Sequence, residues 1–219
     1  MSKIQLVVFD MDGTTLCNEW AHRETKQAII RTLGTNCTLN LEDYIGRSNQ
    51  LFWHDVLENM GLTGDVDELV RRQFSGVLDL IRKSGLRESP GLKDVLQFCK
   101  DTGRKVALCT GSDLWFVSDV LHHLDIADFY DVVITSKDAA RLKPAPDVYI
   151  AALKKAGVAP ENAIGVEDST SGCTAVHGSG MPCIGYLAEG ENKQDLSAAE
   201  YRINRMEEII GILRTIDPD

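Results

Sequence analysis

The sequence predicts an α/β fold: a parallel β-sheet with helices on both faces, and a small helical unit inserted into the chain. An apolar run, Ile4-Gln5-Leu6-Val7-Val8-Phe9, predicts a buried strand near the start. A long stretch with only helical periodicity follows it, and the remainder alternates between short strand-like and helix-like segments. Such alternation is typical of parallel strands joined by crossover helices.

The helical stretch predicts three helices, over residues 20–33, 49–60 and 65–83. Gly76 lies inside the third segment and weakens the prediction of one continuous helix there. No strand pattern interrupts residues 16–85, so we expect these residues to form an inserted helical unit. Residues 1–15 and 86–219 then form the α/β core.

In the core, turn residues separate the segments, and each strand-like run is short and apolar. Strands are predicted over 105–109, 131–135, 163–166 and 182–187, and helices over 92–100, 113–124, 147–156, 170–178 and 206–215. This is a Rossmann-like arrangement. Ligands of such open parallel sheets bind at the carboxyl ends of the strands.

Size, charge and cysteine content limit the possible functions. The 219 residues carry a net charge of −10, which argues against broad binding to nucleic acid or to an anionic membrane. No apolar run approaches the length of a membrane span, and no signal pattern is seen. The six cysteines show neither CxxC nor zinc spacing, which is typical of reduced thiols in a cytoplasmic protein.

Two carboxylates follow the first strand directly, in Phe9-Asp10-Met11-Asp12-Gly13-Thr14-Thr15. Like charges this close raise each other's pKa unless a cation lies between them. Mg²⁺ prefers oxygen ligands and would resolve the repulsion. Asp10 could then attack phosphorus as a nucleophile, and Asp12 could move a proton.

Polar clusters also end two later strands. Thr110-Gly111-Ser112 could present hydroxyl and amide donors to a phosphate. Glu167-Asp168-Ser169 could complete a metal site with Asp10 and Asp12, and Lys143 could supply positive charge. Each cluster alone could be an ordinary turn, a helix cap or a solvated lysine. Their joint occurrence in this order favours a site.

These motifs resemble those of haloacid-dehalogenase-type phosphohydrolases with a helical cap. The chain resembles the branch that holds β-phosphoglucomutase, phosphoglycolate phosphatase and many sugar-phosphate phosphatases, and the resemblance covers essentially the whole chain. The matching segments are Asp10-Met11-Asp12-Gly13-Thr14, Thr110-Gly111-Ser112, Lys143-Pro144-Ala145-Pro146-Asp147 and Gly165-Val166-Glu167-Asp168-Ser169.

The resemblance implies a role for each matching residue. Asp10 would form an aspartyl-phosphate, and Asp12 would protonate the leaving oxygen and then activate water. The Thr110 side chain and the Gly111 and Ser112 amides would hold phosphate oxygens, and Lys143 would bridge nucleophile and phosphoryl group. Mg²⁺ would bind Asp10, the Asp12 carbonyl and Asp168, with Glu167 close by.

Caps of this family close over the substrate, so the resemblance makes His22, Arg47 and Ser48 candidates for substrate binding. Arg47 could hold a second anionic group of the substrate, or it could be an ordinary surface arginine. His22 could relay a proton, or it could be a histidine on a helix surface.

We therefore expect a cytoplasmic, Mg²⁺-dependent phosphatase, monomeric or homodimeric, that acts on a small phosphorylated metabolite such as a sugar phosphate or phosphoglycolate. One alternative is a β-phosphoglucomutase-type mutase. Mutase members carry an arginine where this chain has Asn49, and a lysine near residues 74–80, where this chain has none. A second alternative, a regulator that only senses a phosphorylated ligand, would not need the nucleophile Asp10.

Overall fold

The computed structural model describes residues 4–44, 47–188 and 194–217. The chain divides into two compact units. One comprises Met1–Cys17 and Arg87–Asp219, and the other comprises Asn18–Leu86. Among the described residues, no helix combines the length and the apolar character needed to cross a membrane.

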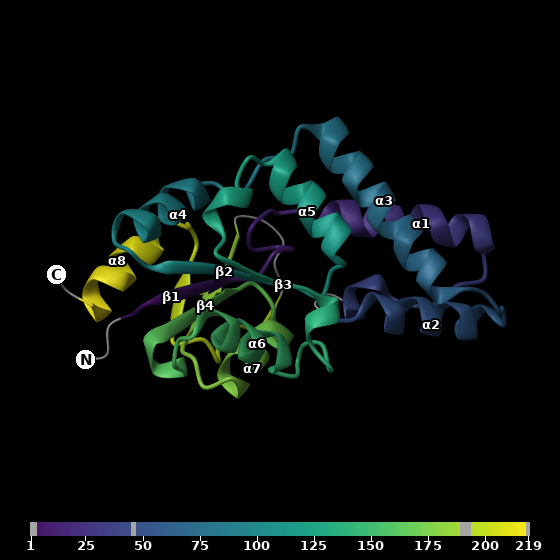
Figure 1. The fold of residues 1–219 in the computed structure, drawn as a ribbon. Helices are drawn as coiled ribbons and strands as arrows, with labels where there is room; N and C mark the ends of the chain where they lie inside the picture. Colours follow the sequence, from purple (N-terminus) through teal and green to yellow (C-terminus); the bar gives the residue numbers. More distant parts are fainter. Residues whose placement is uncertain (1–3, 45–46, 189–193, 218–219) are drawn as a thin grey trace. The chain divides into compact units, whose positions relative to one another are not determined.

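The larger unit contains a six-stranded sheet with the strand order β3-β2-β1-β4-β5-β6 (Figure 1). Every neighbouring pair of strands is parallel. The strands are β1 (Leu6–Phe9), β2 (Lys105–Cys109), β3 (Val132–Ile134), β4 (Ala163–Glu167), β5 (Cys183–Tyr186) and β6 (Tyr201–Ile203). The prediction of a parallel α/β sheet is confirmed.

Strand β1 lies in the middle of the sheet, and both of its faces are buried. Leu6 and Val8 belong to the apolar core that also contains residues of α6 and α7. Successive side chains of a strand point to opposite faces, so Val7 and Phe9 point to the other side, where they are fully buried. The continuous apolar run of β1 is thus explained by helices on both faces of the sheet.

Helices cover the two faces as expected from crossover connections. Figure 1 shows α4 and α8 on one face of the sheet and α6 and α7 on the other. The helices of this unit are α4 (Leu92–Asp101), α5 (Leu114–His123), α6 (Asp147–Ala156), α7 (Thr170–Gly178) and α8 (Glu208–Ile216).

The edge strand β6 was not predicted. It has only three residues, and Arg202 in its middle is exposed. A segment this short shows too little alternation for its sequence to indicate a strand. It forms because the neighbouring strand β5 offers unpaired backbone groups on its outer edge.

The smaller unit contains α1 (Glu19–Leu33), α2 (Asn49–Met60) and α3 (Val66–Ser84). Helix α3 packs against both α1 and α2. It continues through Gly76, and a Cβ atom added there would lie 2.6 Å from Thr25 Cγ2 on α1. Gly76 therefore does not break α3. Its missing side chain instead allows α1 and α3 to approach closely.

Candidate active site

Asp10 lies at the carboxyl end of the central strand β1, between the ends of β2 and β4. Its backbone N–H continues the sheet by donating to the Val166 carbonyl oxygen at 3.0 Å. Its side chain is buried. The loops that follow β2 and β4 therefore flank this carboxylate, which is the place where parallel sheets bind ligands.

A tight loop carries the chain away from Asp10. The Thr15 hydroxyl donates to the Asp10 carbonyl oxygen at 2.7 Å, and the Gly13 N–H donates to the Leu16 carbonyl oxygen at 2.9 Å. Gly13 has φ of +88°, and a Cβ atom there would lie 2.1 Å from Asp168 Oδ2. Glycine is thus required both by the left-handed backbone and by the closely packed Asp168 carboxylate.

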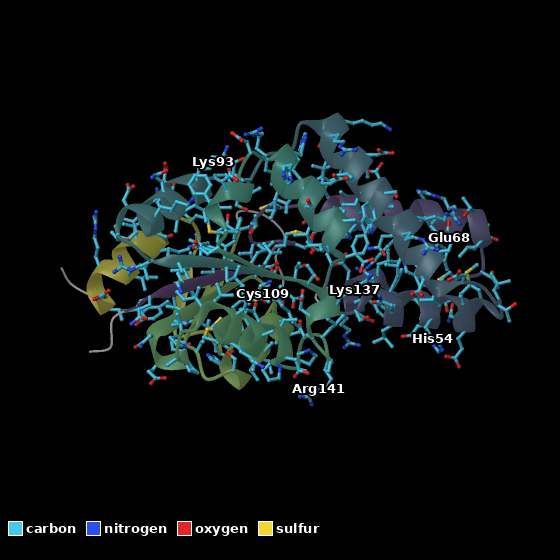
Figure 2. The ribbon with its side chains drawn as sticks, in the orientation of Figure 1. His54, Glu68, Lys93, Cys109, Lys137 and Arg141 are labelled. Atoms are coloured by element: carbon cyan, nitrogen blue, oxygen red, sulfur yellow. The ribbon has the colours of Figure 1, made fainter. Side chains whose placement is uncertain are left out.

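Lys143 joins the ends of three strands through its ammonium group. It donates to Asp10 Oδ1, to Glu167 Oε1 at 2.6 Å, and to the carbonyl oxygen of Cys109 at 3.2 Å. Cys109, labelled in Figure 2, ends β2. Burial acts to lower the pKa of Lys143, but the carboxylates of Asp10 and Glu167 outweigh it and raise that pKa above its usual value. Lys143 therefore stays charged.

The charge of Asp10 is less well compensated by its neighbours than the charge of Lys143. Burial raises the pKa of Asp10 well above its usual value, Lys143 acts to lower it, and the charges of Glu167 and Asp12 raise it further. Several carboxylates thus share one lysine. The negative charge in excess is a physical reason for a cation to bind here.

Asp12 is held by the loop after β2. The Ser112 hydroxyl donates to Asp12 Oδ2 at 3.0 Å, and the Ser112 N–H donates to Thr110 Oγ1 at 3.0 Å. Thr110 and Ser112 are both buried. The structure thus places the predicted phosphate-binding segment 110–112 beside the predicted proton-transfer group.

Three buried carboxylates could hold a metal ion. Asp10, Glu167 and Asp168 each offer one oxygen, and these atoms lie within 4.8 Å of one another. An all-oxygen set of this kind fits Mg²⁺. The side chain of Asp12 is not part of this group. Glu167 already accepts from Lys143 and from the Ser169 hydroxyl, at 3.2 Å, so its position is largely fixed by protein groups.

Tyr149 was missed by the sequence analysis. It lies on α6, is fully buried, and its hydroxyl donates to the same Glu167 oxygen that Lys143 contacts. The Lys143 ammonium also lies 5.1 Å from the centre of its ring. Its position six residues after Lys143 gave no signal, because the contact exists only once α6 packs against the sheet.

We expect Tyr149→Phe to lower the free energy of unfolding by about 1–2 kcal/mol, because one donor to a buried carboxylate is lost. Activity should fall less than in variants of Asp10 or Lys143, since those two residues keep their contact. Urea denaturation and phosphate release check this. Unchanged stability would contradict the role of the Tyr149 hydroxyl in fixing Glu167.

The cap candidates are placed within the smaller unit. His22 is buried on α1, so the alternative of a histidine on a helix surface is wrong. Arg47 is exposed, and the Ser48 hydroxyl caps α2 by accepting from the Leu51 N–H. Ile45 and Gly46 of the same segment lie outside the described residues.

Known proteins are similar along most of this chain. Residues 4–180 match the family model described as "haloacid dehalogenase-like hydrolase". The "Phosphorylated carbohydrates phosphatase" of Thermotoga maritima is 28% identical over 97% of this chain and 100% of its own. "Hexitol phosphatase B" of Escherichia coli is 25% identical over 94% of this chain and 95% of its own. The crystal structure of CbbY from Rhodobacter sphaeroides with phosphate has a TM-score of 0.81 at 24% identity, covering 94% of this chain and 96% of that one.

Proposed function

Because this chain belongs to the haloacid dehalogenase-like hydrolase family and is a phosphoric monoester hydrolase of that type, we propose that it hydrolyses a small phosphorylated metabolite through an aspartyl-phosphate on Asp10. The observation that carries the proposal is the contact of the Lys143 ammonium with the buried Asp10 carboxylate at the end of the central strand. This contact orients the carboxylate and opposes the rise of its pKa that burial causes.

Each core residue then has a chemical task. A carboxylate oxygen of Asp10 attacks phosphorus while the bond between phosphorus and the ester oxygen breaks. Asp12, oriented by Ser112, gives its proton to the leaving alcohol. Asp12 then takes a proton from water, the water oxygen attacks phosphorus, and the Asp10 carboxylate is released with inorganic phosphate.

Lys143 offsets the negative charge of the transferring group, and the loop 110–112 donates hydrogen bonds to its oxygens. Phosphoryl transfer depends mainly on positioning and on charge stabilisation, which these donors provide. Asp10 and Asp168 would bind Mg²⁺ together with the Asp12 carbonyl, and Glu167 would lie beside it. When bound, the ion would offset the negative charge of the phosphate and the carboxylates.

The substrate is proposed to be a sugar phosphate or a compound similar to phosphoglycolate. The names of the relatives support a phosphorylated carbohydrate or polyol. The free cysteines found among the described residues agree with a cytoplasmic location.

A panel of phosphorylated metabolites, assayed for released phosphate with Mg²⁺, tests the proposal. We expect release from at least one sugar phosphate. Turnover of β-glucose 1-phosphate without release of phosphate would instead identify a mutase. Absence of turnover for the whole panel and for a generic aryl phosphate would contradict the proposed hydrolysis.

We expect Mg²⁺ to raise the melting temperature. At about 100 times Kd, binding adds about 2.7 kcal/mol, or about 5–10 °C for a chain of this size. The folded-state pKa of Asp10 is raised, so the metal-free protein holds a proton there as the pH falls, and Mg²⁺ must displace it. The thermal shift should therefore shrink on acidification. Asp168→Asn should lose most of it, and an equal shift in this variant would argue against the site.

We expect Arg47→Ala to raise KM about 10-fold or more for substrates with a second anionic group, because Arg47 is proposed to bind that group. Substrates with one phosphate should change little. Arg31→Ala, which removes another exposed arginine of the same unit, is the control. An equal loss for all substrates would indicate damage to the cap rather than a lost contact.

A further inference from the structure

The smaller unit contains a network of hydrogen bonds centred on the buried side chain of Gln73. The Trp53 indole Nε1–H donates to Gln73 Oε1 at 2.8 Å. Gln73 Nε2 lies 3.0 Å from His22 Nδ1 and 2.9 Å from Asn49 Oδ1. These residues come from all three helices of the unit, and both Gln73 and Trp53 are fully buried.

The chemistry of these groups fixes the direction of every hydrogen bond in this network around Gln73. An indole nitrogen can only donate, so the amide atom of Gln73 that faces Trp53 must be its oxygen. The amide nitrogen of Gln73 therefore faces His22 and Asn49, and it too can only donate. His22 Nδ1 must accept, because a proton on Nδ1 would set two donors against each other.

We propose that Gln73 is a positioning residue that holds His22 in the tautomer with its proton on Nε2. His22 would then act on the substrate as a hydrogen-bond donor, not as an acceptor. This inference rests on the proposed function and on a contact of His22 with the substrate, which the resemblance to the family implies. A donor suits the anionic oxygens and hydroxyl groups of a phosphorylated sugar, whereas an unprotonated Nε2 would repel the anionic oxygens.

Two features favour the His22 tautomer with its proton on Nε2 over the other tautomer. Because Gln73 is fully buried, the opposite tautomer would leave its amide N–H facing another donor at a site closed to solvent. The ring of Phe74 also packs edge-on against the imidazole, with centroids 6.4 Å apart and an interplanar angle of 87°. This contact limits rotation of the ring away from Gln73.

The tautomer is measured directly in the wild-type protein by NMR with ¹⁵N-labelled histidine. The His22 resonances are assigned by comparison with His22→Gln. We expect an unprotonated Nδ1 and a protonated Nε2 at neutral pH. A proton on Nδ1, or shifts that average two tautomers, would overturn the inference.

Gln73→Glu supplies an isosteric test. Its carboxylate can still accept from Trp53 but can no longer donate to His22, so a proton should move to His22 Nδ1. Asn49→Asp is the matched control, because it adds the same charge and keeps an acceptor for Gln73. Its His22 should stay as in wild type. An unchanged His22 in Gln73→Glu, or a changed one in Asn49→Asp, would contradict the proposed role. If Gln73→Glu does not fold, the NMR measurement of the His22 tautomer in the wild-type protein tests the inference by itself.

Kinetics separate this role from a merely structural one. We expect Gln73→Glu to lower kcat/KM about 10- to 100-fold, since a donor to a charged substrate is lost. In the His22→Gln background the glutamine carries its own N–H, so Gln73→Glu should have no further effect there. An equal loss in both backgrounds would refute action through His22. A wild-type protein that releases no phosphate would instead refute the proposed function, and the NMR result would still decide the tautomer.

Discussion

Asp10→Asn is expected to reduce kcat/KM for phosphate release at least about 1,000-fold, because the amide cannot attack phosphorus or form the aspartyl-phosphate. Asn has nearly the same shape as Asp, and Lys143 keeps its contact with Glu167. Burial already disfavours the charge on Asp10, so removing that charge should leave the free energy of unfolding close to that of wild type.

The measurements are steady-state phosphate release and urea denaturation of the same preparations. Glu161→Gln removes an exposed carboxyl group from the same unit and serves as the control. Retention of more than about a tenth of the wild-type activity in Asp10→Asn would rule out Asp10 as the nucleophile.

Lys143→Met is expected to reduce kcat/KM about 100- to 1,000-fold, since the positive charge beside nucleophile and phosphoryl group is lost. It should also lower the free energy of unfolding by about 3–5 kcal/mol at neutral pH, because two buried carboxylates lose their shared cation. A loss of this size still leaves a protein of ordinary stability folded.

The stability loss should depend on pH. Without Lys143 the charge that lowers the pKa of Asp10 is gone, so the pKa of this group rises further. Below the pKa of the wild type, which is the lower of the two, the carboxyl group is neutral in both proteins, and the lysine has less to stabilise. The deficit of Lys143→Met should therefore be largest at neutral pH and shrink on acidification.

Denaturation of both proteins at neutral and acidic pH checks this. Lys137→Met, which changes an exposed lysine of the same unit (labelled in Figure 2), should match wild type at both. A deficit that stays constant or grows on acidification would show that Lys143 stabilises the fold by packing rather than by charge.

Much of the core site could be predicted because its residues follow strands. Asp10, Thr110 and Glu167 each stand at or directly after the end of a short apolar run, and parallel strands bring such ends to one edge of the sheet. Lys143 follows no strand, and the chain itself gives no physical reason for its place. It was singled out with the strand-end clusters and then by resemblance to a known family.

Local pattern failed where a contact depends on packing between distant elements. Tyr149 and Gln73 lie on ordinary amphipathic helices, and nothing nearby in the chain indicates a partner. Gly76 suggested a weak point in α3, whereas the structure uses it for close contact with Thr25. The edge strand β6 is too short to show a period of its own.

The sequence by itself determined the class of fold, the inserted helical segment and the charged groups of the core, because periodicity and turn chemistry act over a few residues. Only the tertiary structure decided that Glu167 is fixed by Lys143 and Tyr149, that Ser112 holds Asp12, and that Gln73 faces His22. These contacts depend on strand order and helix packing, which bring together side chains far apart in the chain and bury them where each donor must meet an acceptor.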